Sequence, residues 1–273
     1  MDKYSVLMSL YTKEKPEYLP LAIESMINQT IKPEEIIIVE DGPLNDELTK
    51  IVDKYKNNYP ELFTIVKNET NLGLGLALNE GLKVARNELV ARMDTDDISK
   101  PDRCEKQLKI FASDEELTIV GSWVDEFNSS IDDIISTRAV PESNEEIYRF
   151  AKKRSAFNHP VVMYKKSKVL QCDGYSNLRR NQDVDLFGRM LFAGCKAYNI
   201  QESLLWFRSN IDLAKRRKSW ENTKSYIKTI KKFWKMGYAS FGNYLSVALA
   251  QTMLFLMPAK MQNWVYRKFL RKK

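Results

Sequence analysis

Short β-rich runs and helical patterns alternate through the first part of the chain, and this alternation restricts the fold more than any other feature. Strands are predicted at residues 5–10, 35–41, 62–67 and 87–93, and helices at about residues 16–29, 45–58 and 73–86. Strands that alternate with helices form parallel sheets joined by right-handed crossovers. The run IIIV in the second strand is typical of a strand that is covered on both faces. We therefore expect an α/β fold, a Rossmann-like sandwich with a mainly parallel central sheet.

The bulk composition is that of a soluble globular protein from a reducing compartment. With 273 residues, 44% of them hydrophobic, the chain can form one large α/β domain, alone or with an appendage. Its cysteines, Cys104, Cys172 and Cys195, lack the close spacing of a disulfide framework or a structural zinc site. The first residues, MDKYSVLMSLYTKEK, have no basic leader and no small-residue cleavage site, the marks of a signal peptide. We therefore expect a cytoplasmic protein.

Charge is divided unevenly along the chain. Residues 212–273 hold 15 Lys and Arg but only two acids, a net charge of +13, which leaves residues 1–211 with 28 Lys and Arg against 34 acids, a net charge of −6. This division predicts two parts with different tasks, a globular domain over residues 1–211 and a basic, amphipathic helical region over residues 212–273.

The basic region contains a run without formal charge, residues 236–259, which is flanked by aromatic and basic side chains. This pattern favours a helical appendage that lies on the anionic inner face of the cytoplasmic membrane as a peripheral attachment. A soluble helical bundle or oligomer contact is an alternative. A spanning helix, which needs about 20 predominantly apolar residues, is another. We expect no nucleic-acid partner, because the region contains no recognisable nucleic-acid-binding module.

Polar residues follow three of the predicted strands. Tyr11 comes after the first strand, Asp41 ends the second, and the sequence DTDD at residues 94–97 follows the fourth. In open parallel sheets, ligands bind at the carboxyl ends of the strands. We therefore expect these side chains to converge at one edge of the sheet.

The acids of the DTDD sequence, Asp94, Asp96 and Asp97, form the densest of these clusters. Two carboxylates about 4 Å apart repel by roughly 4 kcal/mol at an effective dielectric constant near 20, unless a cation lies between them. A site made only of carboxylates suits Mg²⁺ or Mn²⁺. The alternative is a solvated loop in which Asp97 or Ser99 caps a helix that begins near residue 101. An EF-hand loop is excluded, because residues 98 and 99 are Ile and Ser where it needs an oxygen ligand and a glycine.

A series of motifs continues in order over about residues 3–210. It comprises SVLMSLYTKEKPEYLPLAIESMINQT, IIIVEDGP, NLGLGLALNEGL, ELVARMDTDD, GSWVDEF, NHPVVMYKKS and QDVDLFGRML. With this series the chain resembles the family 2 glycosyltransferases of the GT-A fold, and among them bacterial exopolysaccharide and capsule enzymes of the amylovoran-biosynthesis type. The resemblance implies a nucleotide-binding half over about residues 1–100 and an acceptor half over residues 101–211.

The resemblance also implies roles for single residues in binding a UDP-sugar. Tyr11 borders or stacks on the base, Asp41 accepts a hydrogen bond from the uracil ring, and the DTDD acids hold the ribose and the metal. The nucleotide-binding candidates are Leu10, Tyr11, Glu14, Asp41, Asn71, Gly73, Asn79, Arg92, Asp94 and Asp96, and the candidate ligands of Mn²⁺ or Mg²⁺ are Asp96 and Asp97. For Asp41 an ordinary Asp-Gly turn is the alternative.

The chain departs from the family at residue 78. The family pattern after the third strand is N-x-G-x-x-x-A-R-N, and Leu78 stands where arginine is common. A cationic contact to the nucleotide is then missing, and the metal, Lys83 or Arg92 would have to supply that charge.

In the acceptor half, the resemblance makes Asp183 the general base. Gln182 occupies the place where the family usually has glutamate, and Asp185, two residues further along a predicted helix, should face another direction. The alternative is that Asp183 only caps this helix. Further candidates for the acceptor or donor pocket are Trp123, Asp125, His159, Gln182 and Arg208. Of these, His159 and Trp123 could be purely structural, and Arg208 could be a solvated surface residue.

These expectations combine into one reaction. A hexose or N-acetylhexosamine would pass from a UDP-sugar to a growing cell-surface glycan or a lipid-linked oligosaccharide, in a metal-dependent single displacement that inverts the anomeric centre. A sugar-phosphate nucleotidyltransferase is the first alternative, but it would need a glycine- and arginine-rich loop in place of residues 11–15, YTKEK. A membrane-associated scaffold with a degenerate, non-catalytic domain is the second, and the intact acids argue against it.

Overall fold

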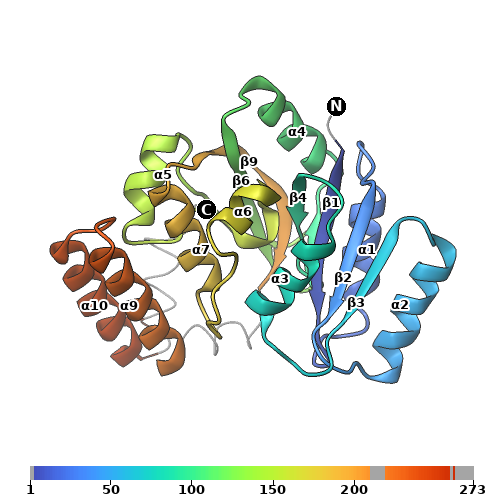
Figure 1. The fold of residues 1–273 in the computed structure, drawn as a ribbon. Helices are drawn as coiled ribbons and strands as arrows, with labels where there is room; N and C mark the ends of the chain where they lie inside the picture. The colour runs from blue at the N-terminus through green and yellow to red at the C-terminus, as the bar shows by residue number, and fades with distance from the viewer. Residues whose placement is uncertain (1–2, 210–218, 259–260, 262–273) are drawn as a thin grey trace.

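The computed structural model describes residues 3–209, 219–258 and 261. Strands and helices alternate through its first half, as the sequence predicts (Figure 1). The elements are β1 (Tyr4–Leu10), α1 (Leu19–Ile27), β2 (Glu35–Glu40), α2 (Asp46–Asn58), β3 (Phe63–Lys67), α3 (Leu74–Val84) and β4 (Leu89–Arg92). Strands β3, β2, β1 and β4 are neighbours in this order, and all three pairs are parallel. The Rossmann-like arrangement expected for this half is confirmed.

The second half extends the same sheet with mixed strand directions. Its elements are β5 (Ile98–Ser99), α4 (Arg103–Ser113), β6 (Leu117–Phe127), β7 (Ile134–Arg138), α5 (Asn144–Ala151), η1 (His159–Val161), β8 (Met163–Lys165), α6 (Lys166–Gln171), α7 (Gln182–Phe192) and β9 (Lys196–Arg208). The full strand order is β3-β2-β1-β4-β8-β6-β9-β5, with β7 paired to β6. Strand β8 is antiparallel to both of its neighbours, and β6 and β9 are parallel. The sheet is therefore parallel up to β4 and mixed beyond it.

A short connection forces the sheet to curl. Residues 93–97 join β4 to β5, although three other strands lie between these two in the sheet. In a flat sheet, β4 and β5 would be separated by four inter-strand steps of about 4.8 Å each. This distance is close to the greatest length that so few residues can span. Strand β5 instead lies against α1, where the backbone N–H of Ser99 donates a hydrogen bond to the Ser25 hydroxyl over 3.0 Å.

Each face of the sheet carries its own hydrophobic core. Side chains of a strand alternate between faces, and in β1 Leu7 belongs to one core whereas Val6 and Met8 belong to the other. Helices α1, α2 and α4 cover the second of these faces, and α3, α5 and α7 contribute to the first. Both faces of β1 and β2 are buried, which explains their continuous apolar sequences.

Two further helices, α9 (Trp220–Lys235) and α10 (Phe241–Leu256), form a hairpin beside α7 (Figure 1). Ser219 and Ser240 cap them, each accepting a hydrogen bond from a backbone N–H three residues later. The ring of Phe233 packs against Gly188, where an added Cβ would lie 2.0 Å from the ring. The predicted helical appendage is present and shares the core of α7. The expected boundary between residues 211 and 212 lies outside the described residues.

The membrane-spanning alternative finds no support in this hairpin. Over residues 3–209 and 219–258, no helix combines the length and the apolar character that a bilayer crossing requires.

Candidate active site

The three acids after β4 meet at one point. Asp94, Asp96 and Asp97 each offer a carboxylate oxygen, and these three oxygens all lie within 4.8 Å of one another. None of the acids caps a helix, since α4 begins at Arg103 with Asp102 in the capping position. The interpretation of this segment as a solvated capping loop is therefore wrong.

Asp97 is the buried member of the cluster. Its Oδ1 accepts a hydrogen bond of 2.8 Å from the backbone N–H of Arg208, and its Oδ2 is buried without a partner. Burial raises the pKa of Asp97 well above its usual range, and the charges of Asp96 and Asp94 raise it further. An unsatisfied buried carboxylate oxygen beside two other carboxylates is a donor set that fits a divalent cation with oxygen ligands.

Arg208 holds the acidic loop in place. Its Nε donates a hydrogen bond of 2.8 Å to the backbone carbonyl of Asp96, and its guanidinium lies 3.9 Å from the ring centre of Tyr18 and 4.6 Å from that of Phe127. The side chain is buried, so the interpretation of Arg208 as a solvated surface residue is wrong. Arg208 is a positioning residue for the acids, and its place in the acceptor or donor pocket stays a prediction.

The loop after β1 contacts the same acidic loop. Glu14 Oε2 accepts a hydrogen bond of 2.9 Å from the hydroxyl of Thr95, which lies between the acids. Leu10 is fully buried as the last residue of β1, whereas Tyr11 is half-buried at the start of the loop. The structure thus brings the carboxyl ends of β1 and β4 together, as the sequence predicts.

Asp41 organises the loop that follows β3. Its two carboxylate oxygens accept hydrogen bonds of 2.7 Å and 3.0 Å from the backbone N–H groups of Leu72 and Gly73. The Asn71 amide donates to the Asp41 carbonyl over 3.0 Å. Gly73 has a φ of +89°, in the region that favours glycine, and the chain turns there into α3. Asp41 therefore stabilises the loop at the edge of the sheet where the nucleotide base is expected to bind. Its contact with uracil stays a prediction.

Asn79 connects α3 to the acceptor half. Its side-chain amide donates to the backbone carbonyl of Tyr175 and accepts from the Tyr175 N–H, both over 2.8 Å. Leu78, where the family commonly has arginine, is fully buried in the hydrophobic core. Lys83 forms an exposed ion pair with Glu80. Leu78 therefore offers no charge to the nucleotide, and a contact of Lys83 with the nucleotide stays a prediction.

Arg92 is the other candidate replacement for the arginine that the family commonly has at position 78. It is buried, its Nη2 donates to Asp94, and its Nε and Nη1 have no hydrogen-bond partner. Although burial disfavours the charge, Asp94 and Asp97 raise the pKa of Arg92, which keeps the guanidinium protonated. Unsatisfied buried donors of a charged group are costly, and this arrangement favours an anionic ligand beside Arg92.

His159 belongs to a buried polar chain. Its Nε2 lies 2.9 Å from the Tyr175 hydroxyl, which in turn donates to the hydroxyl of Tyr164 over 3.4 Å. Burial, and next the charge of Arg92, hold the pKa of His159 well below its usual value. The imidazole of His159 is therefore neutral, and it lies between Arg92 and α7.

Asp183 and Asp185 lie in the first turn of α7 and take different partners. Burial raises the pKa of Asp183, while backbone N–H groups of the helix start and the charges of Arg138 and Arg92 act against this rise. The charge of Arg92 acts to lower the pKa of Asp183, and Asp94 and Asp97 act to raise the pKa of Arg92. Asp183 is half-buried in the structure, and its role as the general base stays a prediction.

Asp185 is fully buried and ion-paired. Its carboxylate receives Lys232 Nζ at 2.6 Å and Arg189 Nε at 2.8 Å, together with the Ser176 hydroxyl. Burial opposes its ionisation, but the bonds from Lys232 and Ser176 and the charge of Arg189 lower the pKa of Asp185 below the usual value. Asp185 joins α7 to α9 and does not share the surroundings of Asp183.

Three other pocket candidates have structural partners. The Trp123 indole donates to the Val140 carbonyl over 3.2 Å. Asp125 accepts from Lys100 at 2.9 Å and from Thr137 at 2.7 Å, and these bonds lower its pKa although burial opposes this. Gln182 is buried, and its side chain lies against Gly75 of α3. Substrate contacts of these residues stay predictions.

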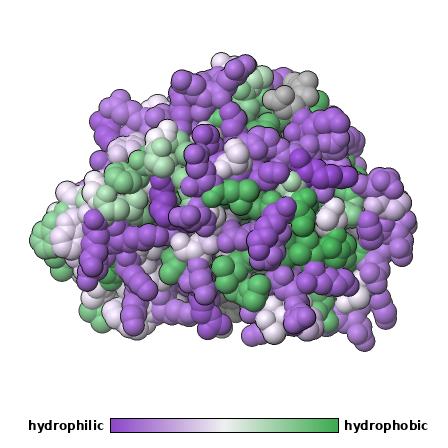
Figure 2. All heavy atoms as spheres, in the orientation of Figure 1, coloured by the Kyte–Doolittle hydropathy of each residue, from purple (hydrophilic) through white to green (hydrophobic). Residues whose placement is uncertain are grey.

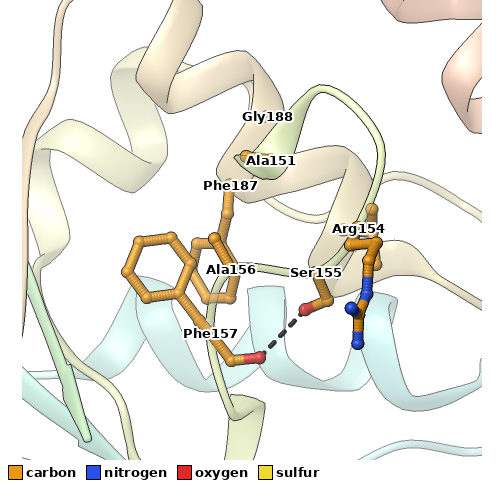
Figure 3. Close-up of a pocket in the computed structure, with 8 residues that line it drawn as sticks. Ala151, Arg154, Ser155, Ala156, Phe157, Phe187 and Gly188 are labelled. Atoms are coloured by element: carbon orange, nitrogen blue, oxygen red, sulfur yellow. Dashed lines mark hydrogen bonds between the residues drawn. The ribbon is translucent and has the colours of Figure 1, made fainter. Parts of the chain in front are cut away.

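The face of α7 near Asp183 packs against residues 151–157 (Figure 3). The rings of Phe157 and Phe187 lie 5.0 Å apart between their centres, and the Ser155 hydroxyl donates to the Phe157 carbonyl over 2.9 Å. The cavity left there measures about 10 Å³, which is about the space of one water molecule. This packing supports α7 and offers no room for a sugar.

Several residues near the site were not singled out in the sequence. Arg138 of β7 donates to the carbonyls of Ser155 and Phe157 and lies near Asp183, and Tyr175 contacts both His159 and Asn79. These partners lie far apart in the sequence, so no local pattern indicates them. Only the pair of Asp185 and Arg189 has a local signal, because residues four apart lie on one face of a helix.

Two curated relatives match almost the full chain. The UDP-Gal:alpha-D-GlcNAc-diphosphoundecaprenol beta-1,3-galactosyltransferase of Escherichia coli is 34% identical over 272 residues, which cover 99% of this chain and 97% of the relative. The amylovoran biosynthesis glycosyltransferase AmsE of Erwinia amylovora is 36% identical over 265 residues, which cover 97% and 98% of the two chains.

Solved structures show the same fold. S. aureus TarS in complex with UDP-GlcNAc superposes with a TM-score of 0.64 at 17% identity, covering 95% of this chain and 77% of TarS. GalNAc-T7 with UDP, GalNAc and Mn²⁺ gives a TM-score of 0.71 at 14% identity, covering 97% and 54% of the two chains. The expected GT-A fold is confirmed.

The family itself is shown by a direct match. The family model for glycosyl transferase family 2 covers residues 5–178. Together with the two relatives of nearly full length, this match makes the chain a glycosyltransferase, and it belongs to glycosyl transferase family 2.

Proposed function

We propose that the enzyme transfers a hexose or an N-acetylhexosamine from a UDP-sugar, with inversion, to a lipid-linked oligosaccharide or another growing cell-surface glycan. The observation that carries this proposal is the buried, unpartnered Oδ2 of Asp97 among three converging carboxylates. Support comes also from the relatives, one of which is named for UDP-Gal, and from related structures that contain UDP-GlcNAc or Mn²⁺.

The donor would bind along the carboxyl ends of β1, β2 and β4. Asp96 and Asp97 would hold Mn²⁺ or Mg²⁺, and the bound cation would neutralise the charge of the diphosphate leaving group as a Lewis acid. Arg92 would offer its free Nε and Nη1 donors to the same anion, in place of the arginine that Leu78 replaces. Asp41 and Tyr11 would contact the base. In this arrangement the cationic groups would lie where the leaving group gains charge.

Asp183 would take the proton from the acceptor hydroxyl as that oxygen attacks the anomeric carbon. A carboxylate is a suitable base for this step when it is ionised and lies within hydrogen-bond reach of the hydroxyl. The positive charges of Arg138 and Arg92 favour the ionised form of Asp183. One base acting opposite the leaving group gives single displacement, and an α-linked donor then gives a β-linked product.

The acceptor is proposed to be membrane-bound. The E. coli relative is named for an acceptor on diphosphoundecaprenol, and the basic residues of α9 would suit attachment to the inner face of the cytoplasmic membrane. We propose that residues 1–211 perform the transfer, with about 1–100 binding the nucleotide and 101–211 the acceptor, and that residues 212–273 provide the attachment.

Hydrolysis of the donor tests the proposal without knowledge of the acceptor. The purified enzyme is incubated with UDP-Gal, UDP-Glc and their N-acetyl forms, with Mn²⁺, Mg²⁺ or a chelator, and UDP release is measured. We expect one donor to be preferred and UDP release to require the cation. Equal UDP release in the presence of chelator would contradict the metal-dependent reaction. With an acceptor in hand, the NMR coupling constant of the new anomeric proton reports inversion.

A further inference from the structure

One side of α10 exposes an apolar stripe, defined as Phe241, Leu245, Leu249, Met253 and Leu256. These residues follow one another at intervals of four, four, four and three, which places them on a single face of the helix. Their exposed fractions are 53%, 45%, 53%, 59% and 73%. Helix α10 contains no Lys, Arg, Asp or Glu. A water-exposed apolar row of this length points to a binding surface.

The neighbouring helix α9 exposes a lysine row, defined as Lys224, Lys228, Lys231 and Lys235. These residues also lie at intervals of three and four, and all four are exposed. No acidic side chain within residues 3–209 and 219–258 forms an ion pair with any of them. Among the described residues, the positive charge of the row therefore has no acidic partner.

The lysine row also borders a cavity. The cavity has a volume of about 540 Å³ and lies between α9 and the segment before α7, with Ser176 and Leu178 on the far wall. Lys228, Lys231 and Lys235 line it, together with Lys232, which already pairs with Asp185. A cavity of this size with several exposed lysine side chains on its wall suits a phosphate group and the atoms attached to it.

The apolar stripe and the lysine row approach each other at the end of the hairpin where α9 is joined to α10. Trp234 of α9 packs on Phe241 and Tyr244 of α10, with ring centres 5.1 Å and 5.5 Å apart. Lys231 precedes Trp234 by three residues, so it lies on the side of α9 that borders α10. Figure 2 shows hydrophilic side chains over α9 and hydrophobic ones at the outer edge of the molecule over α10.

We propose that the α9–α10 hairpin is the docking surface for an anionic phospholipid bilayer. The apolar stripe enters the interface between headgroups and acyl chains, and the lysine row binds lipid phosphates, one of them in the cavity. Interfacial helices combine these two features, an apolar face and adjacent cations. This inference rests on the membrane attachment proposed above and assigns it to particular residues.

A second copy of the chain is a poorer occupant for the same surface. A twofold dimer through the apolar stripe would bring the same patch of both copies together. The lysine rows, which approach the stripe near Phe241, would then bring like charges of the two copies close to each other. An anionic bilayer supplies the opposite charge.

Sedimentation with vesicles tests the docking surface in the full-length protein. We expect binding to vesicles of phosphatidylcholine with phosphatidylglycerol at least about tenfold tighter than to phosphatidylcholine alone, and weaker at high salt. The double variant Leu249→Glu with Met253→Glu should lose binding to both vesicles. The triple variant Lys228→Gln, Lys231→Gln and Lys235→Gln should lose the preference for phosphatidylglycerol.

Matched control variants place the same changes outside the hairpin. Leu21→Glu with Val84→Glu replaces side chains that are 47% and 43% exposed, and Lys50→Gln with Lys54→Gln and Lys83→Gln removes three exposed lysines. Both controls should bind like the wild type. Equal loss of binding in a control and in its hairpin counterpart would overturn the assignment. So would a dimer in sedimentation velocity that the Leu249→Glu and Met253→Glu variant dissociates.

Donor hydrolysis separates this inference from the proposed reaction. In vesicle-free solution both hairpin variants should release UDP within about twofold of the wild-type rate, because these surface residues lie away from the acids. A wild-type protein that releases UDP but ignores anionic vesicles overturns the docking surface and leaves the proposed reaction standing.

Discussion

The backbone N–H of Arg208 donates a hydrogen bond to Oδ1 of Asp97 over 2.8 Å and so joins two positions that are 111 residues apart in sequence. Only one oxygen of Asp97 is used in this way, because Oδ2 is buried without a partner. The fold therefore orients the Asp97 carboxylate beside Asp94 and Asp96 and leaves one of its two oxygens without a hydrogen-bond partner.

The substitution Asp97→Asn should lower the activity of the enzyme without lowering its thermal stability. With Mn²⁺ present, donor hydrolysis should fall by at least about 100-fold, since a ligand of the leaving-group cation is lost. Thermal unfolding without metal should not shift to lower temperature, because the substitution removes repulsion from Asp94 and Asp96. Retained hydrolysis in a destabilised variant would contradict the metal-ligand role.

Arg92→Lys should raise the KM for the donor by about tenfold with a smaller change in kcat. Lysine keeps the charge but loses the two planar donors, Nε and Nη1, that have no partner in the protein. Arg103→Lys is the control, because the buried guanidinium of Arg103 bonds to the Arg92 and Val162 carbonyls and to Gln107. The control variant should lose thermal stability and keep its KM.

Asp183→Asn should reduce transfer to an acceptor by about 100-fold or more, because a positioned general base contributes 10²–10⁴ in rate. Equilibrium binding of UDP, measured by calorimetry, should stay unchanged. Normal turnover by this variant would eliminate Asp183 as the base.

The pH profile provides a second measure of Asp183. Burial raises its pKa, and only the ionised form accepts a proton. The acidic limb of kcat/KM should therefore lie above the usual Asp value near 3.9, with the rate falling as the pH decreases. A limb at or below that value would contradict the raised pKa of Asp183.

The substitution Asp185→Asn should destabilise the enzyme. It is the matched comparison for Asp183→Asn, because both residues lie in the first turn of α7. It leaves Arg189 and Lys232 without their carboxylate, which should lower the free energy of unfolding by about 3 kcal/mol at pH 7. The folded-state pKa of Asp185 is below its unfolded value, so this contribution is present above about pH 4 and is lost as the pH falls through the folded pKa. Urea unfolding at pH 7 should show the loss for Asp185→Asn and not for Asp183→Asn.

Gly188→Ala should loosen the contact between α7 and α9. An added Cβ would lie 2.0 Å from the Phe233 ring, and overpacking of this kind costs about 2 kcal/mol. Gly242→Ala on α10 is the control, since its nearest atom, the Ser240 hydroxyl oxygen, is 3.7 Å away. Thermal unfolding should show a lower midpoint for the first variant only. Equal midpoints would mean that the hairpin contributes little to the core.

The first half of the fold was predictable because its signals are local. The apolar run of β2 and the helical spacing in α1 both act over a few residues, and the observed boundaries differ from the predicted ones by only a few residues. Helix α1, for example, begins at Leu19 and not at residue 16, since the Tyr18 N–H bonds back to the Lys15 carbonyl over 3.0 Å. The acids after β4 were predictable for the same reason.

Long-range partners account for what the sequence did not indicate. The amide of Asn79 binds the backbone of Tyr175, 96 residues away, and its contact with the nucleotide stays a prediction. The burial of Arg208 depends on Tyr18 and Phe127, which no spacing in the sequence connects to it. Such partners become visible only when the curled sheet places its distant strands side by side.

The short connection between β4 and β5 also limits how this enzyme can be engineered. Because residues 93–97 are fixed at both ends by strands of one sheet, an insertion or deletion there would shift β5 along β9 and misplace Ser99 against α1. Libraries of variants that are designed to accept new donor sugars should therefore keep the length of residues 93–97 constant. They should vary the side chains of the surrounding residues.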